Sequence, residues 1–315
     1  MFAYVIRRLL AAIPIAIGVS MVCFALVYLA PGDPVQTLLP PDADAQTVAT
    51  LKRLYGLDQP LPIQYLEWLG RVASGDFGRS IATGRPVADE IFRSLGNTVL
   101  LASLSVLVAF SIAFILGTIA GRKAGSWVDR VVTGVAVLGV SIPNYWLGIV
   151  MVIVFSVEMM ALPASGMAGE KFDPTSWEHI QYLILPVFTL SMIPVGIIAR
   201  TTRSAVSEVM NQEFVVTLRA NGLPEWRVLR HALKNALPPV LAVMGLQFGT
   251  LMGGSILVET VFSWPGSGFL LSKAILTRDV PVLQGTILVL ALIFVATNLI
   301  VDLFQSSIDP RIRRA

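Results

Sequence analysis

The feature that most constrains this 315-residue chain is a set of apolar segments, each about 20 residues long. A hydrocarbon core about 30 Å thick takes roughly 20 helical residues to cross. Charged residues make up 14% of the chain, against about 25% in an average soluble domain. The sequence therefore predicts an all-α integral membrane protein with six transmembrane helices, at Leu9–Ala30, Thr98–Ala120, Val131–Val157, Ile180–Ala199, Leu237–Phe262 and Pro281–Phe304.

Lys and Arg are divided unequally between the two sides that six spans define. The side holding both termini, residues 122–130 and residues 200–234 contains 14 of the 23 Lys and Arg but only 6 of the 20 Asp and Glu. Short loops rich in Lys and Arg stay in the cytoplasm. We therefore expect cytoplasmic N- and C-termini and a cytoplasmic loop at 201–236.

We expect three parts: an N-terminal tail with the first transmembrane helix (1–30), an extracytoplasmic insertion (31–97), and a core of five transmembrane helices (98–315) that contains the loop 201–236. Arg7 and Arg8 precede the first apolar run as in a signal peptide, but the run is about 22 residues long against the usual 7–15, which favours a retained helix. Within the insertion, Asp44–Tyr55 and Leu61–Val72 show helical spacing. This small helical insertion is either a cap on the membrane surface or a contact face for an external delivery protein, and the two are compatible.

The sequence argues against an enzyme and against a bound cofactor. It contains no Gly-x-x-x-x-Gly-Lys-Ser/Thr phosphate loop, no Gly-x-Ser-x-Gly elbow and no His-Glu-x-x-His helix. The single cysteine, Cys23, lies in the first span, so no internal disulfide can form. His179 and His231 fall on opposite sides of the predicted membrane, which disfavours a histidine metal centre.

The fifth span contains glycines spaced four residues apart at 245, 249 and 253, which share one helix face and permit close approach of another backbone. Two interpretations are open: packing within the chain, or a stripe that lines a central pathway or a seam with a second subunit. Glu259, near the outer end, is either an interfacial carboxylate that caps the next turn or a group at the mouth of the pathway. The candidate pathway or seam residues are Gln247, Gly249, Thr250, Gly253 and Glu259.

The cytoplasmic loop is predicted to form a helix–turn–helix. Ser204–Asn221 is compatible with a helix, Gly222 is a fitting stop, and Pro224 precedes a second helix over Glu225–Ala236. Apolar residues are inserted in both helices, which implies burial against a soluble partner or against the helix ends. They are Phe214, Val215, Leu218, Val228 and Leu229.

Four segments carry a resemblance to a known family. Glu213–Pro238 resembles the cytoplasmic coupling motif of ATP-binding-cassette import permeases, the Glu-Ala-Ala loop with its downstream Gly. Arg7–Pro34, Glu259–Gly266 and Val301–Arg313 are similar to the dipeptide/oligopeptide/nickel permeases, so the resemblance covers essentially the whole chain. Glu-Thr-Val-Phe-Ser-Trp-Pro-Gly, which begins at Glu259, is its most specific string.

Three positions depart from the family pattern. Leu218 replaces a usual alanine of the coupling motif. Ser267 follows Pro-Gly where the family more often has a large aliphatic residue, and Gly96 stands where Pro is common. These departures leave docking intact and bear on the fine fit and on the substrate.

The resemblance implies a permease subunit of an ATP-driven importer in the bacterial cytoplasmic (inner) membrane. Its implied partners are a second homologous permease, two ATP-binding subunits that hydrolyse ATP, an extracytoplasmic solute-binding protein and the lipid bilayer, without nucleic acid. The residues that the resemblance assigns to coupling with the ATPase are Glu213, Thr217, Ala220, Gly222, Leu223, Arg227, Arg230 and His231.

The cargo suggested by the resemblance is a di- or oligopeptide, with nickel chelates, glutathione, sugars or opines as alternatives. Two other classes of protein remain open. A secondary transporter usually shows an internal repeat and broken helices with midplane charges, neither of which is clear here. A non-transporting assembly or sensor subunit is the other alternative.

Overall fold

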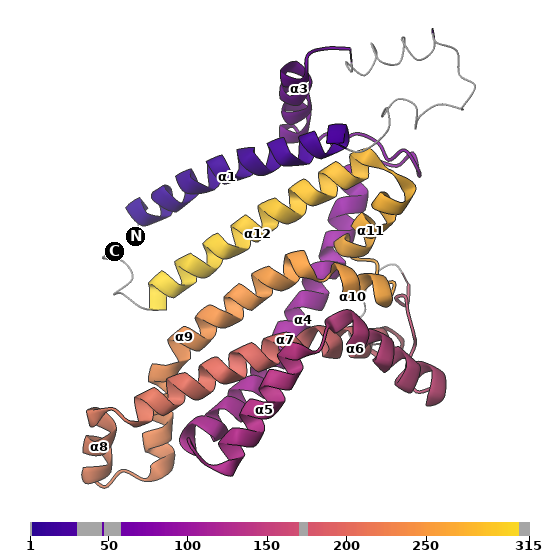
Figure 1. The fold of residues 1–315 in the computed structure, drawn as a ribbon. Helices are drawn as coiled ribbons and strands as arrows, with labels where there is room; N and C mark the ends of the chain where they lie inside the picture. Colours follow the sequence, from indigo (N-terminus) through magenta and orange to yellow (C-terminus); the bar gives the residue numbers. More distant parts are fainter. Residues whose placement is uncertain (1, 30–45, 47–57, 170–175, 309–315) are drawn as a thin grey trace.

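A computed structural model describes residues 2–29, 46, 58–169 and 176–308. Every regular element in that part is a helix. The long helices lie side by side, and the start of the first helix and the end of the last lie toward the same end of the molecule as residues 213–220 (Figure 1). The predicted helix Asp44–Tyr55, apart from Gln46, and the segment Asp309–Arg313 lie outside the described residues. The elements are α1 (Phe2–Leu29), α3 (Leu61–Ala73), α4 (Val87–Arg122), α5 (Trp127–Ser141), α6 (Asn144–Met151), η2 (Val152–Glu158), α7 (Trp177–Met210), α8 (Glu213–Ala220), α9 (Glu225–Gly254), α10 (Ile256–Val261), α11 (Ser267–Thr277) and α12 (Val280–Ile308).

The predicted all-α fold with several membrane-spanning helices is confirmed, but the number of six spans is not. Within the described residues, α4, α7, α9 and α12 are long and apolar enough to cross a bilayer. The bent pair formed by α5 with α6 and η2 makes a fifth crossing if it counts as one span. The sixth span, expected in α1, and the orientation of the termini stay predictions.

The third predicted span, Val131–Val157, is not a continuous helix. Helix α5 ends at Ser141, and the chain then turns by 95° before α6 begins at Asn144. Pro143 explains the break: proline disfavours the helical conformation in the residue before it, and Ile142 has an extended ψ of 124°. The last part of the segment, η2, is wound as a π-helix.

The helices of the loop at 201–236 also differ from their predicted bounds. Ser204–Asn221 is not one helix, because α7 runs on to Met210 and α8 starts at Glu213. Conversely, the predicted loop helix Glu225–Ala236 and most of the fifth span join into the single helix α9, which ends at Gly254. The loop helices are thus largely extensions of the long helices α7 and α9, which are held together there by apolar contacts. The buried members of this cluster are Val206, Val209, Ala232 and Ala236.

Helix α7 lies at the centre and packs against α4, α5 and α9. Small residues make this packing close. A Cβ placed on Gly117 of α4 would lie 2.6 Å from the carbonyl oxygen of Ala199 on α7. Likewise, a Cβ on Gly245 of α9 would lie 2.6 Å from Val301 of α12. Glycine at these positions therefore sets the separation of the helix backbones.

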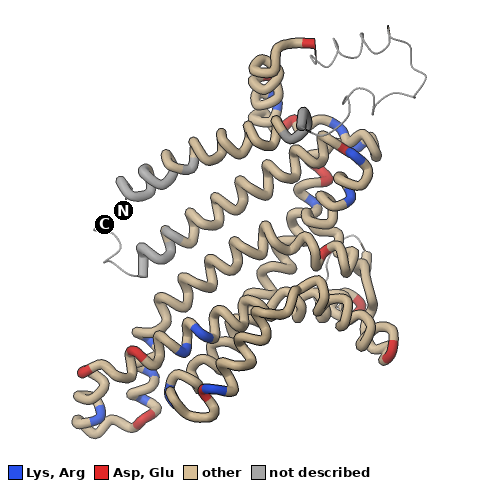
Figure 2. Tube along the Cα trace, in the orientation of Figure 1, with Lys and Arg blue, Asp and Glu red and all other residues tan. Residues whose placement is uncertain are grey.

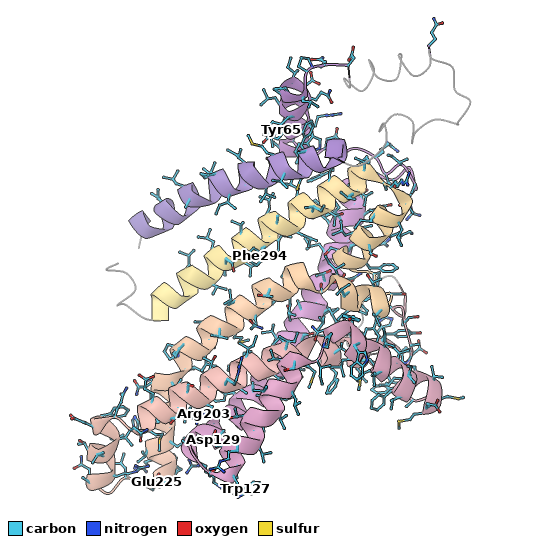
Figure 3. The ribbon with its side chains drawn as sticks, viewed as in Figure 1. Tyr65, Trp127, Asp129, Arg203, Glu225 and Phe294 are labelled. Carbon is cyan, nitrogen blue, oxygen red and sulfur yellow. The ribbon has the colours of Figure 1, made fainter. Side chains whose placement is uncertain are left out.

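The end of the molecule opposite α8 is built from α3, α11 and the turns before α4 (Figure 1). The predicted helix at Leu61–Val72 is confirmed as α3, and it lies against α1, where Tyr65 and Ser20 share a hydrogen bond of 2.7 Å (Figure 3). Helix α11 was not predicted. Asp279, just before α12, accepts hydrogen bonds from the Ser80 hydroxyl (2.5 Å) and the Ala82 amide (3.1 Å), which ties the turn before α4 to the α11–α12 corner.

Candidate coupling site on the cytoplasmic loop

The turn between α8 and α9 is formed at Gly222, as the sequence predicts. Gly222 has a φ of +74°, a left-handed conformation that glycine adopts without strain. Its amide donates to the carbonyl of Arg219 (2.9 Å), and the Leu223 amide donates to the carbonyl of Leu218 (3.2 Å). These two bonds close the C-terminal end of α8. Pro224 then starts α9 with its extended backbone.

The apolar residues of the loop divide into a buried base and an exposed remainder. Val215 of α8 and Val228 of α9 are both fully buried. Phe214 packs on the cluster that joins the ends of α7 and α9. The sequence left burial against a soluble partner or against the helix ends open; Val215 and Val228 are buried within the chain, and Phe214 packs on the helix ends.

The residues predicted to couple to an ATPase lie on the outside of this element. Leu223 is half-buried and the other seven are exposed, namely Glu213, Thr217, Ala220, Gly222, Arg227, Arg230 and His231. Two large apolar side chains that the sequence analysis missed are exposed beside them, Val216 (62% exposed) and Trp226 (60% exposed). Their exposure could have been inferred from their positions in the helices. Val216 follows the buried Val215 and Trp226 lies two residues before the buried Val228, and residues one or two positions apart on a helix point in different directions.

The surface of the loop is organised by a few charged contacts. Arg219 donates from Nε to Glu225 Oε1 at 2.8 Å, bridging α8 to the first turn of α9. This hydrogen bond raises the pKa of the Arg219 guanidinium, which stays cationic. The Arg227 guanidinium lies 5.2 Å from the ring centroid of Trp226. Figure 2 shows Lys and Arg at this end, on α7, α8, α9 and the start of α5, together with Asp and Glu on the same helices.

A second charged contact lies next to the loop, between α5 and α7. Arg203 donates from Nε to Asp129 Oδ1 (2.9 Å) and from Nη2 to Asp129 Oδ2 (2.7 Å), and Figure 3 shows the two side chains meeting. Asp129 also accepts from the Gly125 amide, and its own amide donates to the Ser126 hydroxyl. Sequence reasoning missed this pair, although Ser126 followed three residues later by an acid is a helix-start signature.

The candidate pathway residues do not share one environment. Gln247, Gly249 and Glu259 face the interior of the chain, and a Cβ on Gly249 would lie 3.2 Å from Asn298 Oδ1 of α12. Thr250 and Gly253 are exposed. The glycine stripe therefore packs within the chain at Gly249, and it opens outward only at Gly253.

Thr250 and Gly253 belong to an exposed face on the C-terminal half of α9 and on α10. The other exposed residues of this face are Leu246, Gly254, Leu257 and Thr260. Their spacing follows the helical period. An apolar stripe with hydroxyl groups is left without a partner in the described part of the chain.

The described residues offer no metal site, since no group of three or more His, Cys, Asp or Glu side chains comes together among them. What the loop presents instead is a surface with exposed Trp226 and Val216 among charged residues, arginines included. Aromatic residues and arginine are enriched in protein–protein interfaces. The arrangement thus fits the docking of a soluble protein.

The chain is similar to known transport proteins over nearly its whole length. Residues 113–314 match the family described as binding-protein-dependent transport system inner membrane component, and residues 1–105 match its N-terminal membrane component. The dipeptide transport system permease protein DppB of Alkalihalophilus pseudofirmus is 42% identical, with 99% of this chain and 100% of that protein covered. The glutathione transport system permease protein GsiC is 42% identical in Escherichia coli K12 and 41% identical in Salmonella typhi, with 99% of each chain covered.

Proposed function

Because the chain belongs to the inner-membrane components of binding-protein-dependent transport systems, and so is a multi-pass permease subunit of an ATP-driven importer, we propose that its cytoplasmic loop docks the ATPase. The observation that carries this is the exposed surface of α8 and of the first turn of α9, with Val216 and Trp226 standing out from a buried base. In this family the permease is not the catalytic component, and ATP hydrolysis occurs in separate subunits.

The proposed docking uses the two halves of the loop differently. Phe214 packs on the apolar cluster between the ends of α7 and α9, and Val215 and Val228 are fully buried, so force applied to α8 would reach both long helices. Exposed Val216 and Trp226 supply the apolar contact, and Arg227 and Arg230 supply positive charge at its rim. Apolar anchors within a polar rim are the usual anatomy of such an interface.

The proposed assembly contains one ATP-binding subunit for each of two permeases, of which this chain is one. The exposed stripe on α9 and α10, from Leu246 to Thr260, supports a seam or pathway shared with the second permease. Six spans with cytoplasmic termini place α8 on the cytoplasmic side. The start of α1 and the end of α12 lie toward the same end of the molecule as α8 (Figure 1), which supports this proposed orientation.

The proposed cargo is a di- or oligopeptide or a tripeptide-sized solute such as glutathione. The support is that relatives at equal identity are named for dipeptide and glutathione transport. All of these solutes carry peptide bonds and charged termini. The delivering binding protein would select among them.

The assembly is tested by mild-detergent purification of this chain from its own membranes, with co-purifying proteins identified by mass spectrometry. Recovery of a second permease and ATP-binding subunits, together with ATP hydrolysis stimulated by the loaded binding protein, is the expected result. Recovery of the chain alone, in a detergent that keeps a known importer intact, would contradict the proposal.

A further inference from the structure

The inference concerns Glu259, the first residue of the most specific sequence string and a group that the coupling site does not use. Its side chain is fully buried, and both carboxylate oxygens accept hydrogen bonds. Oε1 accepts from the hydroxyls of Thr98 on α4 (2.8 Å) and Ser255 at the end of α9 (2.7 Å). Oε2 accepts from the amides of Gly268 (2.7 Å) and Phe269 (3.1 Å) in the first turn of α11.

Thr98 extends this network to a second contact with α11. Its hydroxyl hydrogen goes to Glu259, so the Ser267 hydroxyl, 2.8 Å away, donates to Thr98 Oγ1. The Ser267 amide donates to the same oxygen at 2.8 Å. A carboxylate at a helix N-terminus is favoured by the unpaired amides and by the helix dipole. One carboxylate therefore joins α4, α9, α10 and α11, and its four donors match its acceptor capacity.

Gly266, which ends the string, and Gly268, two residues later, are both required by the close packing around Glu259. A Cβ on Gly266 would collide with the Glu259 carboxyl group and would lie 2.6 Å from Thr98 Oγ1. A Cβ on Gly268 would lie 2.6 Å from the Cα of Ile256 and 2.9 Å from Glu259 Oε2. Only glycine lets the start of α11 approach this close, so the acid and the two glycines form one structural unit.

The network lies at the opposite end of α9 from the coupling site. Helix α9 has 30 residues, which corresponds to a length of about 45 Å. Its first turn carries Glu225 and Trp226, and the residue that follows its last turn, Ser255, bonds to Glu259. A rigid helix that is fixed at both ends transmits displacement from one end to the other.

We propose that Glu259 is a positioning residue that fixes the outer end of α9 to α4 and α11, so that movement of the coupling loop shifts these outer ends together. The proposal rests on the proposed function, since it requires an ATPase that moves the loop. It assigns the string Glu259–Gly266 to transmission within the permease, with no contact to solute.

The test is hydrogen exchange measured by mass spectrometry on the purified wild-type complex with its ATP-binding subunits, with and without ATP plus vanadate. The variants are Glu259→Gln, which replaces an acceptor oxygen by a donor, Thr98→Val, which removes a hydroxyl, and Thr98→Ser, which keeps it. Glu158→Gln, an exposed acid at the end of η2, is the matched control.

In the wild type, the nucleotide should change exchange both in residues 213–231 and in residues 255–270. Glu259→Gln and Thr98→Val should keep the first response and lose the second, while Thr98→Ser and Glu158→Gln behave as wild type. The amides of Gly268 and Phe269 should exchange about tenfold faster in Glu259→Gln even without nucleotide, because a charge-assisted hydrogen bond is lost.

An unchanged response of residues 255–270 in Glu259→Gln and Thr98→Val would overturn the proposal, as would the lack of any such response in the wild type. If Glu259→Gln fails to assemble, the comparison of Thr98→Val with Thr98→Ser decides alone. Failure of the proposed function looks different, because the wild-type chain would then purify without ATP-binding subunits or show no nucleotide response at residues 213–231.

Discussion

Arg203 on α7 donates two parallel hydrogen bonds, of 2.9 and 2.7 Å, to the carboxylate of Asp129 on α5. The pair lies at the end of the molecule that carries the coupling loop. The Asp129 side chain is 6% exposed and the Arg203 side chain 36%. The pair also holds the turn at Gly125, so the α4–α5 connection is fixed to α7. Any movement of α7 that starts at the loop is thereby shared with α5.

Replacing Arg203 by Met should destabilise the protein, because it leaves the buried Asp129 carboxylate without its main partner. We expect a loss of about 1–3 kcal/mol, toward the lower end because Arg203 is partly exposed and screened by solvent. Thermal unfolding in detergent measures it. The double variant Asp129→Asn with Arg203→Met should recover part of the loss. Arg130→Met, at an exposed neighbouring arginine, serves as control, and equal melting temperatures for all the variants would contradict the prediction.

Replacing Gly117 by Ala should separate α4 from α7, since the new Cβ would lie 2.6 Å from both the Ala199 carbonyl oxygen and the Thr202 side chain. Overpacking of this kind costs about 1–3 kcal/mol. The control is Gly134→Ala on α5, where no described atom lies within 4 Å of the new Cβ and where alanine should stabilise the helix by up to about 1 kcal/mol. Melting temperatures that move in opposite directions would support the prediction, and a shared rise would refute it.

Replacing Gly222 by Val should strain the turn, because a β-branched residue is disfavoured at φ +74°. We expect weaker coupling, seen as a smaller stimulation of ATP hydrolysis by the loaded binding protein, at unchanged membrane insertion. Gly222→Asn should retain most of the stimulation, since Asn tolerates the left-handed region. Gly222→Pro should be the most severe of the three. Loss of stimulation in Gly222→Asn equal to that in Gly222→Val would show that the conformation is not what matters.

Replacing Val216 by Asp or Trp226 by Ala should weaken the association with the ATP-binding subunit, because these exposed apolar side chains have no role in the buried base. Truncation of an aromatic anchor in an interface typically costs about 2 kcal/mol or more, or roughly thirtyfold in Kd. Co-purification and surface-binding assays with the isolated ATPase measure it. Leu66→Asp on the outer helix α3, at a side chain 64% exposed, is the control and should bind normally.

Replacing Glu213 by Lys tests the sign of the charge at the start of α8. The acid is exposed in the first helical turn, where its negative charge interacts favourably with the helix dipole. We expect uncoupling of ATP hydrolysis from uptake, with the protein still inserted and assembled. The same reversal at Glu178, an acid in the first turn of α7 at its other end, should leave coupling intact. Full uptake in Glu213→Lys would remove this residue from the coupling surface.

Several local features were predictable because a short stretch of sequence is sufficient to specify them. Gly222 adopts the left-handed turn that its place between two helical stretches indicates. Val215 and Val228 are buried as the apolar spacing predicts. By contrast, the continuity of α9 was not predictable from Pro238 and Pro239, which favour a break that the packing on α12 and α7 overrides.

The role of a side chain was harder to predict when its partner is distant in the sequence. The string from Glu259 to Gly266 was recognised by its residues, yet its partner Thr98 lies 161 positions away. The Asp129–Arg203 pair, 74 positions apart, was missed for the same reason. Exposure of Val216 beside buried Val215 depends on how α8 is rotated against α7 and α9, which periodicity alone leaves open.

The sequence by itself determined the class of the molecule. Apolar runs of membrane length, the bias of Lys and Arg, and the turn at Gly222 are local properties, and they depend only on the preference of nearby residues for lipid or water and on backbone sterics. The tertiary structure alone decided which polar groups meet. It buried Glu259 under four hydrogen-bond donors and left Trp226 in solvent. The physical reason is that a buried polar group is stable only with its partners in place, and those partners come together only when distant helices pack.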